Sequence, residues 1–345
     1  MAKPLLRLLD ANLNRAREGL RVLEDYARFV RDDFALSERL KTVRHRLAAA
    51  TRAIDAQAIA HRDTPGDVGT GYAINASLPR AELVDIVTAA GKRVGEALRS
   101  VEEYLKTIDP VAAREVEQIR YLHYDNEQLI ARGFAPKDHR LAKMRLYVVV
   151  TEAHCAGRPW VEVARAALAG NADVIQLREK NLEGGELTKR ARQLVALCRE
   201  FGAISIINDR ADVALIADAD GVHLGQGDLA ARDARKLLGD RKIVGVSTHT
   251  IEQARQATLD TADYLGVGPV FPSTTKPRDI APGLAYARQV AAEIRISAVA
   301  IAGITPENAA QVVATGMQAI AVTSAICAAP DVESAARNLR AALTT

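Results

Sequence analysis

Hydroxyl and cationic side chains are concentrated in one short stretch, GPVFPSTTKP at residues 268–277. The stretch follows the apolar run YLGV and places three consecutive hydroxyl side chains, Ser273 to Thr275, directly before Lys276. A turn after a buried strand needs glycine or proline, but it does not need three hydroxyls beside an ammonium group. These groups suit a phosphate or diphosphate, which carries charge and accepts many hydrogen bonds. The stretch therefore indicates an anion site, with a solvated turn as the alternative.

Residues of related chemistry stand at the ends of other short apolar runs in the second half of the chain. If these runs are parallel strands of one barrel, their carboxyl ends meet at a single mouth, where the active sites of such barrels form. One polar residue at a strand end is ordinary capping, but suitable residues at seven consecutive ends predict a binding site. Besides the stretch at 268–277, they are Gln176, Arg178, Lys180, Asn208, Asp209, Gln226, Asp228, Ser247, His249, Gly303, Thr323 and Ser324.

Two carboxylates in this set form a candidate metal site. Asp209 and Asp228 follow neighbouring runs in the sequence. Mg²⁺ prefers few carboxylates, together with water and the phosphate oxygens of a substrate. The pair therefore predicts Mg²⁺ as a cofactor.

The remaining residues predict two anion sites at the same mouth. Cationic side chains supply donors for a phosphate or diphosphate. Glycine and hydroxyl residues after the last two runs occupy the place where barrels of this kind hold phosphate. Two anion sites imply two phosphorylated substrates, or one diphosphate and one monophosphate. The cations are Arg178, Lys180 and Lys276, and the residues after the last two runs are Gly303, Thr323 and Ser324.

The elements that must hold these residues predict an α/β domain over residues 145–345. Eight β-branched runs, from LYVVVT to AIAVTS, alternate with amphipathic stretches such as ELTKRARQLVALCREFG. Eight strands alternating with helices in about 200 residues are typical of a (β/α)8, or TIM, barrel. A doubly wound open sheet is the alternative. We favour the barrel because the runs number eight and no Gly-rich dinucleotide fingerprint follows the first of them.

Residues 1–132 predict an all-α domain built from a repeat. Apolar residues between Leu6 and Val30 recur at spacings of three and four, and those between Leu83 and Ile108 repeat the pattern. Each of these helices is followed by a second amphipathic stretch. The repeat therefore predicts two helical hairpins packed as a four-helix bundle. We expect residues 133–144, with Gly, Pro and several charges, to be a linker.

The charged residues of the repeat have two interpretations. Arg and Glu positions of the two helices match at an offset of 78 residues, as Glu24 and Glu102 do. We expect them to form a solvated face, with a functional role as the alternative. The stretch HRDTPGDVGTG between the hairpins is either a simple connection or a contact for a small molecule or partner.

Composition excludes several classes of protein. The chain has 345 residues, a net charge of +3 and 26% charged residues, so a bulk nucleic-acid binder is not indicated. No apolar run approaches the roughly 18 residues of a membrane span. The three cysteines follow no metal-ligand spacing and are expected to be reduced thiols. We expect a cytoplasmic protein without membrane or nucleic-acid partners, as a monomer or a homo-oligomer.

The motifs together resemble a known family. QLREK, IINDR, DGVHLGQGD, GVSTH, ADYLGVGPVFPSTTKP and AIAGIT occur in the order found in thiamine-phosphate synthases, over roughly residues 145–340. The resemblance implies a transferase that joins an aminopyrimidine-methyl diphosphate to a thiazole phosphate, giving thiamine phosphate and diphosphate. It also implies that the N-terminal repeat is the helical extension of some family members.

The resemblance implies a role for each candidate residue. Gln176, Arg178, Lys180 and Asn208 would hold the pyrimidine diphosphate, and Asp209 and Asp228 would hold Mg²⁺. Ser247 and Lys276 would contact the pyrimidine substrate and its diphosphate, and with Arg178 and Lys180 they would act in catalysis. Ser273, Thr275, Gly303, Thr323 and Ser324 would hold the thiazole phosphate. The sequence departs from the family pattern at Ser273, where threonine is common, and at Ala302–Gly303, where Gly-Gly is common.

Two other functions remain open at this point. A related barrel that aromatises the thiazole phosphate, a tautomerase, would need the phosphate pocket but neither the acid pair nor the diphosphate cations. A non-catalytic sensor of thiazole phosphate would use the bundle as its output module. The presence of Asp209, Asp228 and Lys276 favours the synthase over both.

Overall fold

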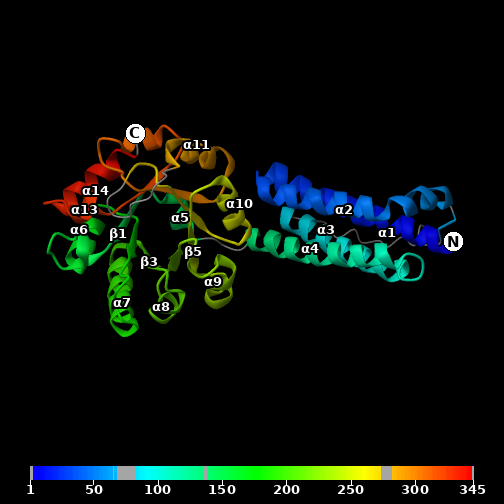
Figure 1. Cartoon of the computed structure of the whole chain (residues 1–345), viewed down its shortest axis with the longest axis horizontal. Coiled ribbons are helices and arrows are strands. Elements are labelled where there is room, and N and C mark those ends of the chain that lie inside the picture. The colour runs from blue at the N-terminus through cyan, green and yellow to red at the C-terminus, as the bar shows by residue number, and fades with distance from the viewer. Residues whose placement is uncertain (1–2, 65, 68–81, 135–137, 273–281, 344–345) are drawn as a thin grey trace. The chain divides into compact units, whose positions relative to one another are not determined.

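The chain divides into two compact units, Met1–Phe134 and Ala135–Thr345. The computed structural model describes residues 3–64, 66–67, 82–134, 138–272 and 282–343. Figure 1 shows that the first unit is helical and that strands and helices alternate in the second. No helix within these described residues is long and apolar enough to cross a membrane.

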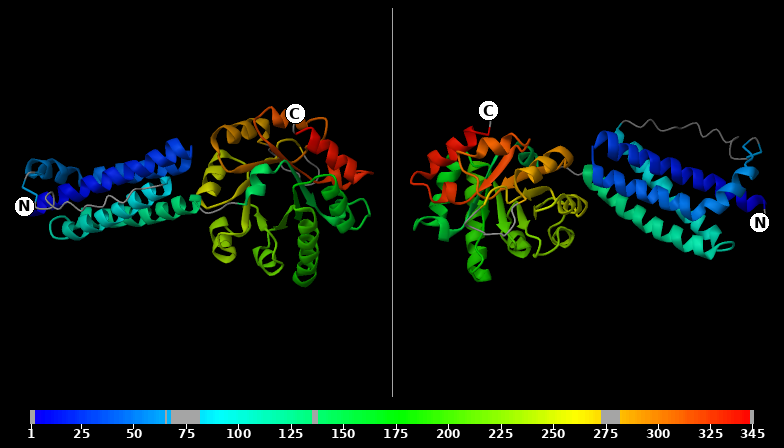
Figure 2. Two further views of the ribbon diagram at one scale, coloured as in Figure 1. Left: turned by 180° about the vertical axis from the view of Figure 1, so that it is seen from behind. Right: turned by 45° about the horizontal axis from the view of Figure 1, so that its top comes forward.

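The first unit is a bundle of four long helices, as the repeat predicts. Helices α1 and α2 pack together, as do α3 and α4, and the two hairpins join through contacts of α1 with α3 and of α2 with α4 (Figure 2). The apolar stripe beginning at Leu6, Leu9 and Leu13 is buried between the helices, because spacings of three and four place it on one face. The helices are α1 (Lys3–Asp25), α2 (Phe34–Ala58), α3 (Leu83–Leu105) and α4 (Pro110–Phe134), with short turns η1 (Tyr26–Val30) and η2 (Ile59–His61).

Glu24 and Glu102 are not on a solvated face, so that expectation was wrong for this pair, whereas the repeated Glu18 and Glu96 are exposed as expected. Glu24 is 5% exposed and Glu102 is 1% exposed. Arg44 Nε of α2 donates to Glu24 at 2.8 Å, and Arg120 Nε of α4 donates to Glu102 at 2.7 Å. In each hairpin an arginine of the second helix thus forms an ion pair with a buried glutamate of the first. The helical pattern alone could not find these partners, because they come from the second helix of each hairpin.

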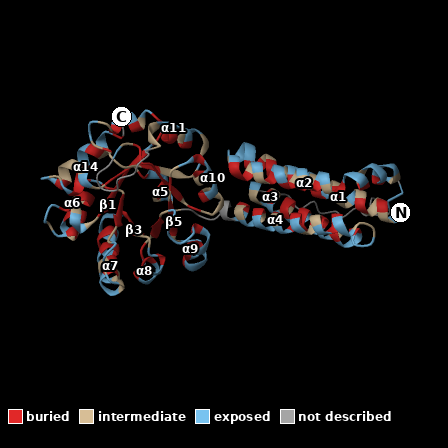
Figure 3. Cartoon of the chain, in the orientation of Figure 1, coloured by how far each residue is buried: buried red, intermediate tan, exposed pale blue. Residues whose placement is uncertain are grey.

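The second unit is a closed parallel barrel, which excludes the open-sheet alternative. Strands pair in chain order, and β1 also pairs with β8 through Leu146 opposite Ile320 and Val148 opposite Val322. Buried residues lie on the strands and on the helix faces toward them (Figure 3). The strands are β1 (Leu146–Val150), β2 (Val174–Leu177), β3 (Ile204–Asn208), β4 (Gly221–Leu224), β5 (Ile243–Thr248), β6 (Tyr264–Val267), β7 (Ser297–Ile301) and β8 (Ala319–Val322).

Helices surround the strands and follow the expected alternation. The C-terminal helix of the barrel, α14, packs against α6, so the first and last helices are also neighbours. The helices are α6 (Trp160–Ala169), α7 (Gly184–Phe201), α8 (Ala211–Ile216), α9 (Ala231–Leu238), α10 (Ile251–Leu259), α11 (Gly283–Glu293), α12 (Ala309–Val313), α13 (Ser324–Cys327) and α14 (Val332–Ala341), with the turn η4 (Glu152–His154) after β1.

Aspartates fix the amino-terminal ends of the strands. An aspartate directly precedes each of the strands β2, β4 and β6; these are Asp173, Asp220 and Asp263. Each accepts a 2.8 Å hydrogen bond from a backbone N–H at the start of the strand before it, those of Leu146, Ser205 and Val244. A carboxylate that accepts this hydrogen bond fixes the register of the two neighbouring strands. It also satisfies a backbone N–H that the hydrogen bonds of the sheet leave without a partner.

The helix α5 (His139–Lys143) closes the barrel interior and lies within the segment predicted as a linker. Leu141 is 6% exposed and Met144 is 2% exposed, and both belong to the apolar cluster inside the barrel with Tyr147 and Tyr264. Arg140 anchors this helix through an ion pair with Asp220 at 2.6 Å. The segment therefore contributes side chains to the barrel core.

We predict that the barrel folds without the bundle only when α5 is retained. A fragment of residues 138–345 should unfold cooperatively in urea. A fragment of residues 145–345 should lose on the order of 4 kcal/mol of unfolding free energy, because two buried apolar side chains leave the core. Equal unfolding free energies of the two fragments would show that α5 is dispensable.

Candidate active site

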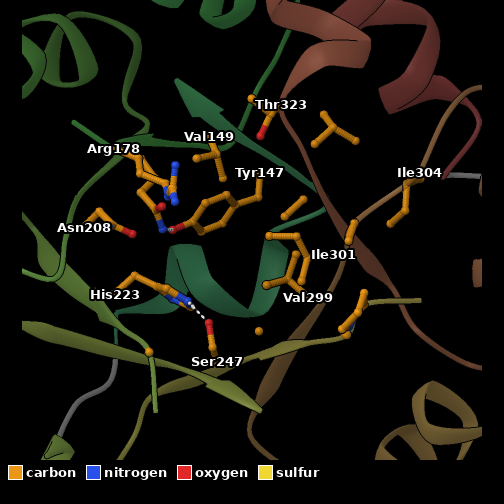
Figure 4. A pocket seen from close by; sticks show the side chains of 18 of the residues that line it. Tyr147, Val149, Arg178, Asn208, His223, Ser247, Val299, Ile301, Ile304 and Thr323 are labelled. Carbon is orange, nitrogen blue, oxygen red and sulfur yellow. Dashed lines mark hydrogen bonds between the residues drawn. The ribbon is translucent and has the colours of Figure 1, made fainter. Parts of the chain in front are cut away.

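A cavity of about 500 Å³ occupies the mouth of the barrel. Its floor is formed by apolar residues that point into the barrel, including Val149, Val299 and Ile301 (Figure 4). Its wall consists of residues at the carboxyl ends of the strands. Most of the strand-end residues predicted from the sequence line it, namely Gln176, Arg178, Lys180, Asn208, Asp209, Asp228, Ser247, His249, Gly303, Thr323 and Ser324. Gln226 is not among the lining residues; its side-chain amide donates to the backbone carbonyl of Ser247 instead.

Three predicted residues cannot be placed. Ser273, Thr275 and Lys276 lie outside the described residues. The described chain ends on one side at Pro272, which lines the cavity, and resumes at Pro282.

A cation and two carboxylates lie together on one side of the cavity. Lys180 Nζ is 3.1 Å from Asp209 Oδ2. Burial raises the pKa of Asp209 above its ordinary value, and the hydrogen-bonded carboxyl of Asp228 raises it further, while Lys180 opposes both effects. Two carboxylates this close resist simultaneous ionisation. A further positive charge at this place would stabilise both.

The backbone turns sharply to bring Asp209 into this cluster. Its φ is +62°, in the left-handed region that a residue with a Cβ rarely adopts. The turn is held by the Asp209 N–H, which donates to the carbonyl of His223 on the next strand at 2.8 Å. Asp228 is held separately, since its Oδ2 accepts a 2.7 Å hydrogen bond from the N–H of Gly225. Both acids are thus positioned by backbone contacts of the β3 and β4 ends.

A chain of buried hydrogen bonds crosses the bottom of the cavity. Gln176 Nε2 donates to the Tyr147 hydroxyl at 2.7 Å, and the Tyr147 and Tyr264 hydroxyls are 2.9 Å apart. The Tyr264 hydroxyl is 2.8 Å from His223 Nδ1, and His223 Nε2 is 2.8 Å from Ser247 Oγ. Burial raises the pKa of both tyrosines, so they remain neutral donors.

The amide at one end fixes the direction of the first bond in this chain. An amide nitrogen can only donate, so the Tyr147 hydroxyl accepts from Gln176. Tyr264 and His223 continue the chain to Ser247, which lines the cavity (Figure 4). His223 thus holds the Ser247 hydroxyl at the cavity.

Two histidines and two tyrosines belong to the site or its support. His223 in the motif DGVHLGQGD could be a core histidine bonded to backbone or a ligand contact; in the structure it is bonded to two side chains and lines the cavity. His249 also lines the cavity and lies next to Thr250, the N-cap of α10. Tyr147 and Tyr264 carry no signal of a site in the sequence, because each stands in an apolar run where an aromatic residue is ordinary core.

On the other side of the cavity, the ends of β7 and β8 supply a glycine turn and two hydroxyls. Ala302 has a φ of +83° and Gly303 a φ of +66°, so two successive residues are left-handed. A Cβ at Gly303 would lie 2.4 Å from the carbonyl oxygen of Pro272, which only glycine avoids. Thr323 and Ser324, at the β8 end, line the same cavity.

The arrangement defines a class of protein. A closed (β/α)8 barrel whose mouth combines cations, an acid pair and hydroxyl groups around an apolar floor is characteristic of an enzyme that acts on phosphorylated small molecules.

Comparison with known proteins defines the family. Residues 146–326 match the sequence profile of the family described as thiamine monophosphate synthase, and residues 7–129 match that of the ThiD2 family. The chain is 42% identical to a thiamine-phosphate synthase of Rhodopirellula baltica over 94% of this chain and 89% of that protein. It is 41% identical to one of Synechococcus sp. (strain WH7803), over 98% of this chain and 96% of the other.

A solved structure agrees with these relatives. A thiamine phosphate pyrophosphorylase from Pyrococcus furiosus superposes with a TM-score of 0.55 and 38% identity, over 60% of this chain and 98% of that one. The chain belongs to the thiamine-phosphate synthase family and is a transferase of thiamine biosynthesis.

We predict opposite effects of substitutions at the two left-handed positions after β7. Ala302→Gly should raise the unfolding free energy by roughly 0.5–1 kcal/mol, because it removes the strain of a Cβ at positive φ. Gly303→Ala should lower it by about 2 kcal/mol, because the new methyl meets the Pro272 carbonyl. Urea unfolding of both variants tests this, and losses of equal size at the two positions would contradict the difference in their surroundings.

Proposed function

We propose that the enzyme joins 4-amino-2-methyl-5-pyrimidinylmethyl diphosphate to a thiazole phosphate at this cavity, with release of diphosphate. The observation that carries the proposal is the division of one cavity into two chemically different sides. The acid pair and Lys180 lie at the β2 to β4 ends, and the glycine turn with Thr323 and Ser324 lies at the β7 and β8 ends. A diphosphate with its counter-ion suits the first side, and a monophosphate suits the second.

The donor set of the first side fits Mg²⁺. Asp209 and Asp228 are in contact, and their mutual repulsion is compensated only in part by Lys180. In the part of the chain that the structure describes, no group of three or more potential ligands occurs among His, Cys, Asp and Glu. A site with few carboxylates suits Mg²⁺, which takes its other ligands from water and phosphate oxygens. When bound, Mg²⁺ would supply positive charge to the leaving diphosphate.

We assign the pyrimidine end of the first substrate to residues of β2, β3 and β5. Gln176 and Asn208 offer amide donors and acceptors at adjacent strand ends. Ser247 offers a hydroxyl that His223 holds at the cavity and that would form a hydrogen bond with the ring of the substrate. These contacts would fix the methylene carbon in the middle of the cavity, facing the second substrate.

Positioning and charge stabilisation would account for the catalysis. Bond cleavage between the methylene carbon and the diphosphate oxygen places negative charge on the departing diphosphate. Arg178, Lys180 and Lys276 would stabilise that charge as it develops. The thiazole nitrogen then attacks the methylene carbon, so no nucleophile of the protein is required.

The thiazole phosphate would bind on the second side. Gly303 allows the tight turn against the Pro272 carbonyl that lines this side of the cavity, and Thr323 and Ser324 contribute hydroxyl donors. We assign Ser273 and Thr275 to the same phosphate on the basis of the family motif. With both phosphates held apart, the apolar floor between them would receive the two rings.

We predict that Asp209→Asn and Asp228→Asn each lower kcat at least about 100-fold and raise the Mg²⁺ concentration needed for half-maximal activity. The side chains keep their shape, so the loss reflects the missing charge. Formation of thiamine phosphate is measured against Mg²⁺ concentration. Asp212→Asn, which removes an exposed carboxylate paired with Arg210, is the matched control and should behave like the wild type. Full activity in a strong chelator would exclude the metal assignment.

We predict that Lys276→Ala lowers kcat more than it raises KM for the pyrimidine diphosphate. The loss should be about 2–4 kcal/mol of transition-state stabilisation, since the charge matters most as the diphosphate departs. Steady-state kinetics with each substrate varied in turn gives both parameters. Lys189→Ala, at an exposed position of α7, is the control. An effect on KM alone would mean that Lys276 binds only the ground state.

A further inference from the structure

Two cysteines meet where the barrel closes, and the proposed chemistry leaves them unused. Cys155 follows the turn η4 in the loop after β1, and Cys327 ends α13, which follows β8. Because β1 pairs with β8, residues from opposite ends of the barrel sequence become neighbours. Both side chains are fully buried, and both thiols are free.

Hydrogen bonds to neighbouring backbone groups and to one shared arginine place the two cysteines side by side. Cys155 Sγ donates to the carbonyl oxygen of Thr151 at 3.3 Å, and Cys327 Sγ donates to that of Val149 at 3.6 Å. The guanidinium of Arg158 donates to the backbone carbonyls of both cysteines, at 3.2 Å to Cys155 and 2.8 Å to Cys327. A single side chain thus holds the two backbone segments together.

The two thiols differ in reactivity. They lie close enough to influence each other: the interaction with Cys327 lowers the pKa of Cys155, and the interaction with Cys155, together with burial, raises the pKa of Cys327. The thiolate is the nucleophile in disulfide exchange, so Cys155 is the attacking residue and Cys327 the resolving one. Burial in α7 raises the pKa of Cys198 to about 12, so the third thiol is unreactive.

Cys155 directly precedes a turn at the surface. Its neighbour Ala156 is exposed and has a φ of +51°, and Gly157 is exposed with a φ of +79°. A local opening of this turn would expose Cys155 without unfolding the barrel.

We propose that Cys155 and Cys327 form a reversible disulfide that staples the β1–β8 seam beside the phosphate-binding residues Thr323 and Ser324. The Cys155 thiolate attacks one sulfur of a small external disulfide such as oxidised glutathione, which releases one thiolate. The Cys327 thiolate then attacks the sulfur of Cys155 in the resulting mixed disulfide and displaces the second external thiolate. The two protein thiols are oxidised, the external disulfide is reduced to two thiols, and the two protons leave with them.

The staple would act on the second side of the cavity. Thr323 and Ser324 lie at the β8 end and the start of α13, and Cys327 is the last residue of that short helix. Tying it to the loop after β1 fixes the position of both hydroxyls. The effect on substrate binding rests on the proposed function, whereas the formation of the disulfide does not.

The test uses the full chain equilibrated with oxidised or reduced glutathione, followed by alkylation, proteolysis and mass spectrometry. We expect a peptide pair crosslinked through Cys155 and Cys327 in the oxidised sample, with Cys198 alkylated. The thermal midpoint should rise by roughly 5 °C or more on oxidation and return with dithiothreitol, because the crosslink closes a long loop. Cys198→Ser is the matched control and should show both effects, while Cys155→Ser and Cys327→Ser should show neither.

The oxidised wild-type protein tests whether the disulfide forms even if a serine variant fails to fold. Complete alkylation of both cysteines after oxidation, or only separate glutathione adducts on them, would overturn the proposal. We also expect KM for the thiazole phosphate to change several-fold on oxidation while KM for the pyrimidine diphosphate stays within about twofold. A crosslink that leaves both KM values unchanged would support the disulfide and count against the proposed position of the thiazole phosphate.

Discussion

The pairing of β1 with β8 is the interaction on which the active site depends. A parallel sheet that closes on itself brings the carboxyl ends of all its strands to one mouth, so residues from 147 to 325 share one cavity. An open sheet would leave the β2 to β4 ends and the β8 end at opposite edges. At the other end of the barrel, Asp173, Asp220 and Asp263 fix the strand starts, and α5 fills the interior. These stabilising contacts thus lie at the end of the barrel opposite the active site.

The mouth itself carries features that oppose folding. Asp209 adopts a left-handed conformation and shares its surroundings with Asp228, and both its strain and its raised pKa are tolerated because neighbouring strands hold it. Ala302 is strained in the same way on the opposite side. Such strain is typical of sites where polar groups are placed before the ligand arrives. The barrel supplies the rigidity that allows it.

In the helical unit, ion pairs between helices specify the packing. Its two hairpins are related by a repeat, and in each a buried glutamate pairs with an arginine of the other helix, Glu24 with Arg44 and Glu102 with Arg120. Buried ion pairs are costly unless both charges are satisfied, and they favour one alignment of two helices over others. The pairs therefore specify how each hairpin packs. This unit matches a family profile of its own and has its own apolar core.

Sequence alone determined the class of both units and identified most of the polar strand-end residues that line the cavity. Periodicity of three and four gave the bundle, and eight β-branched runs gave the barrel, because each pattern is local and reports one buried face. The residues at the strand ends could be chosen in advance because barrel geometry sends every such end to one mouth. What the sequence could not supply were contacts between residues distant in the chain. The tertiary structure alone decided that Glu24 and Glu102 are buried, that α5 belongs to the barrel, and that Tyr147 and Tyr264 link Gln176 to His223 and Ser247. Each of these depends on a partner from another element, and a pattern within one element carries no information about which partner lies opposite.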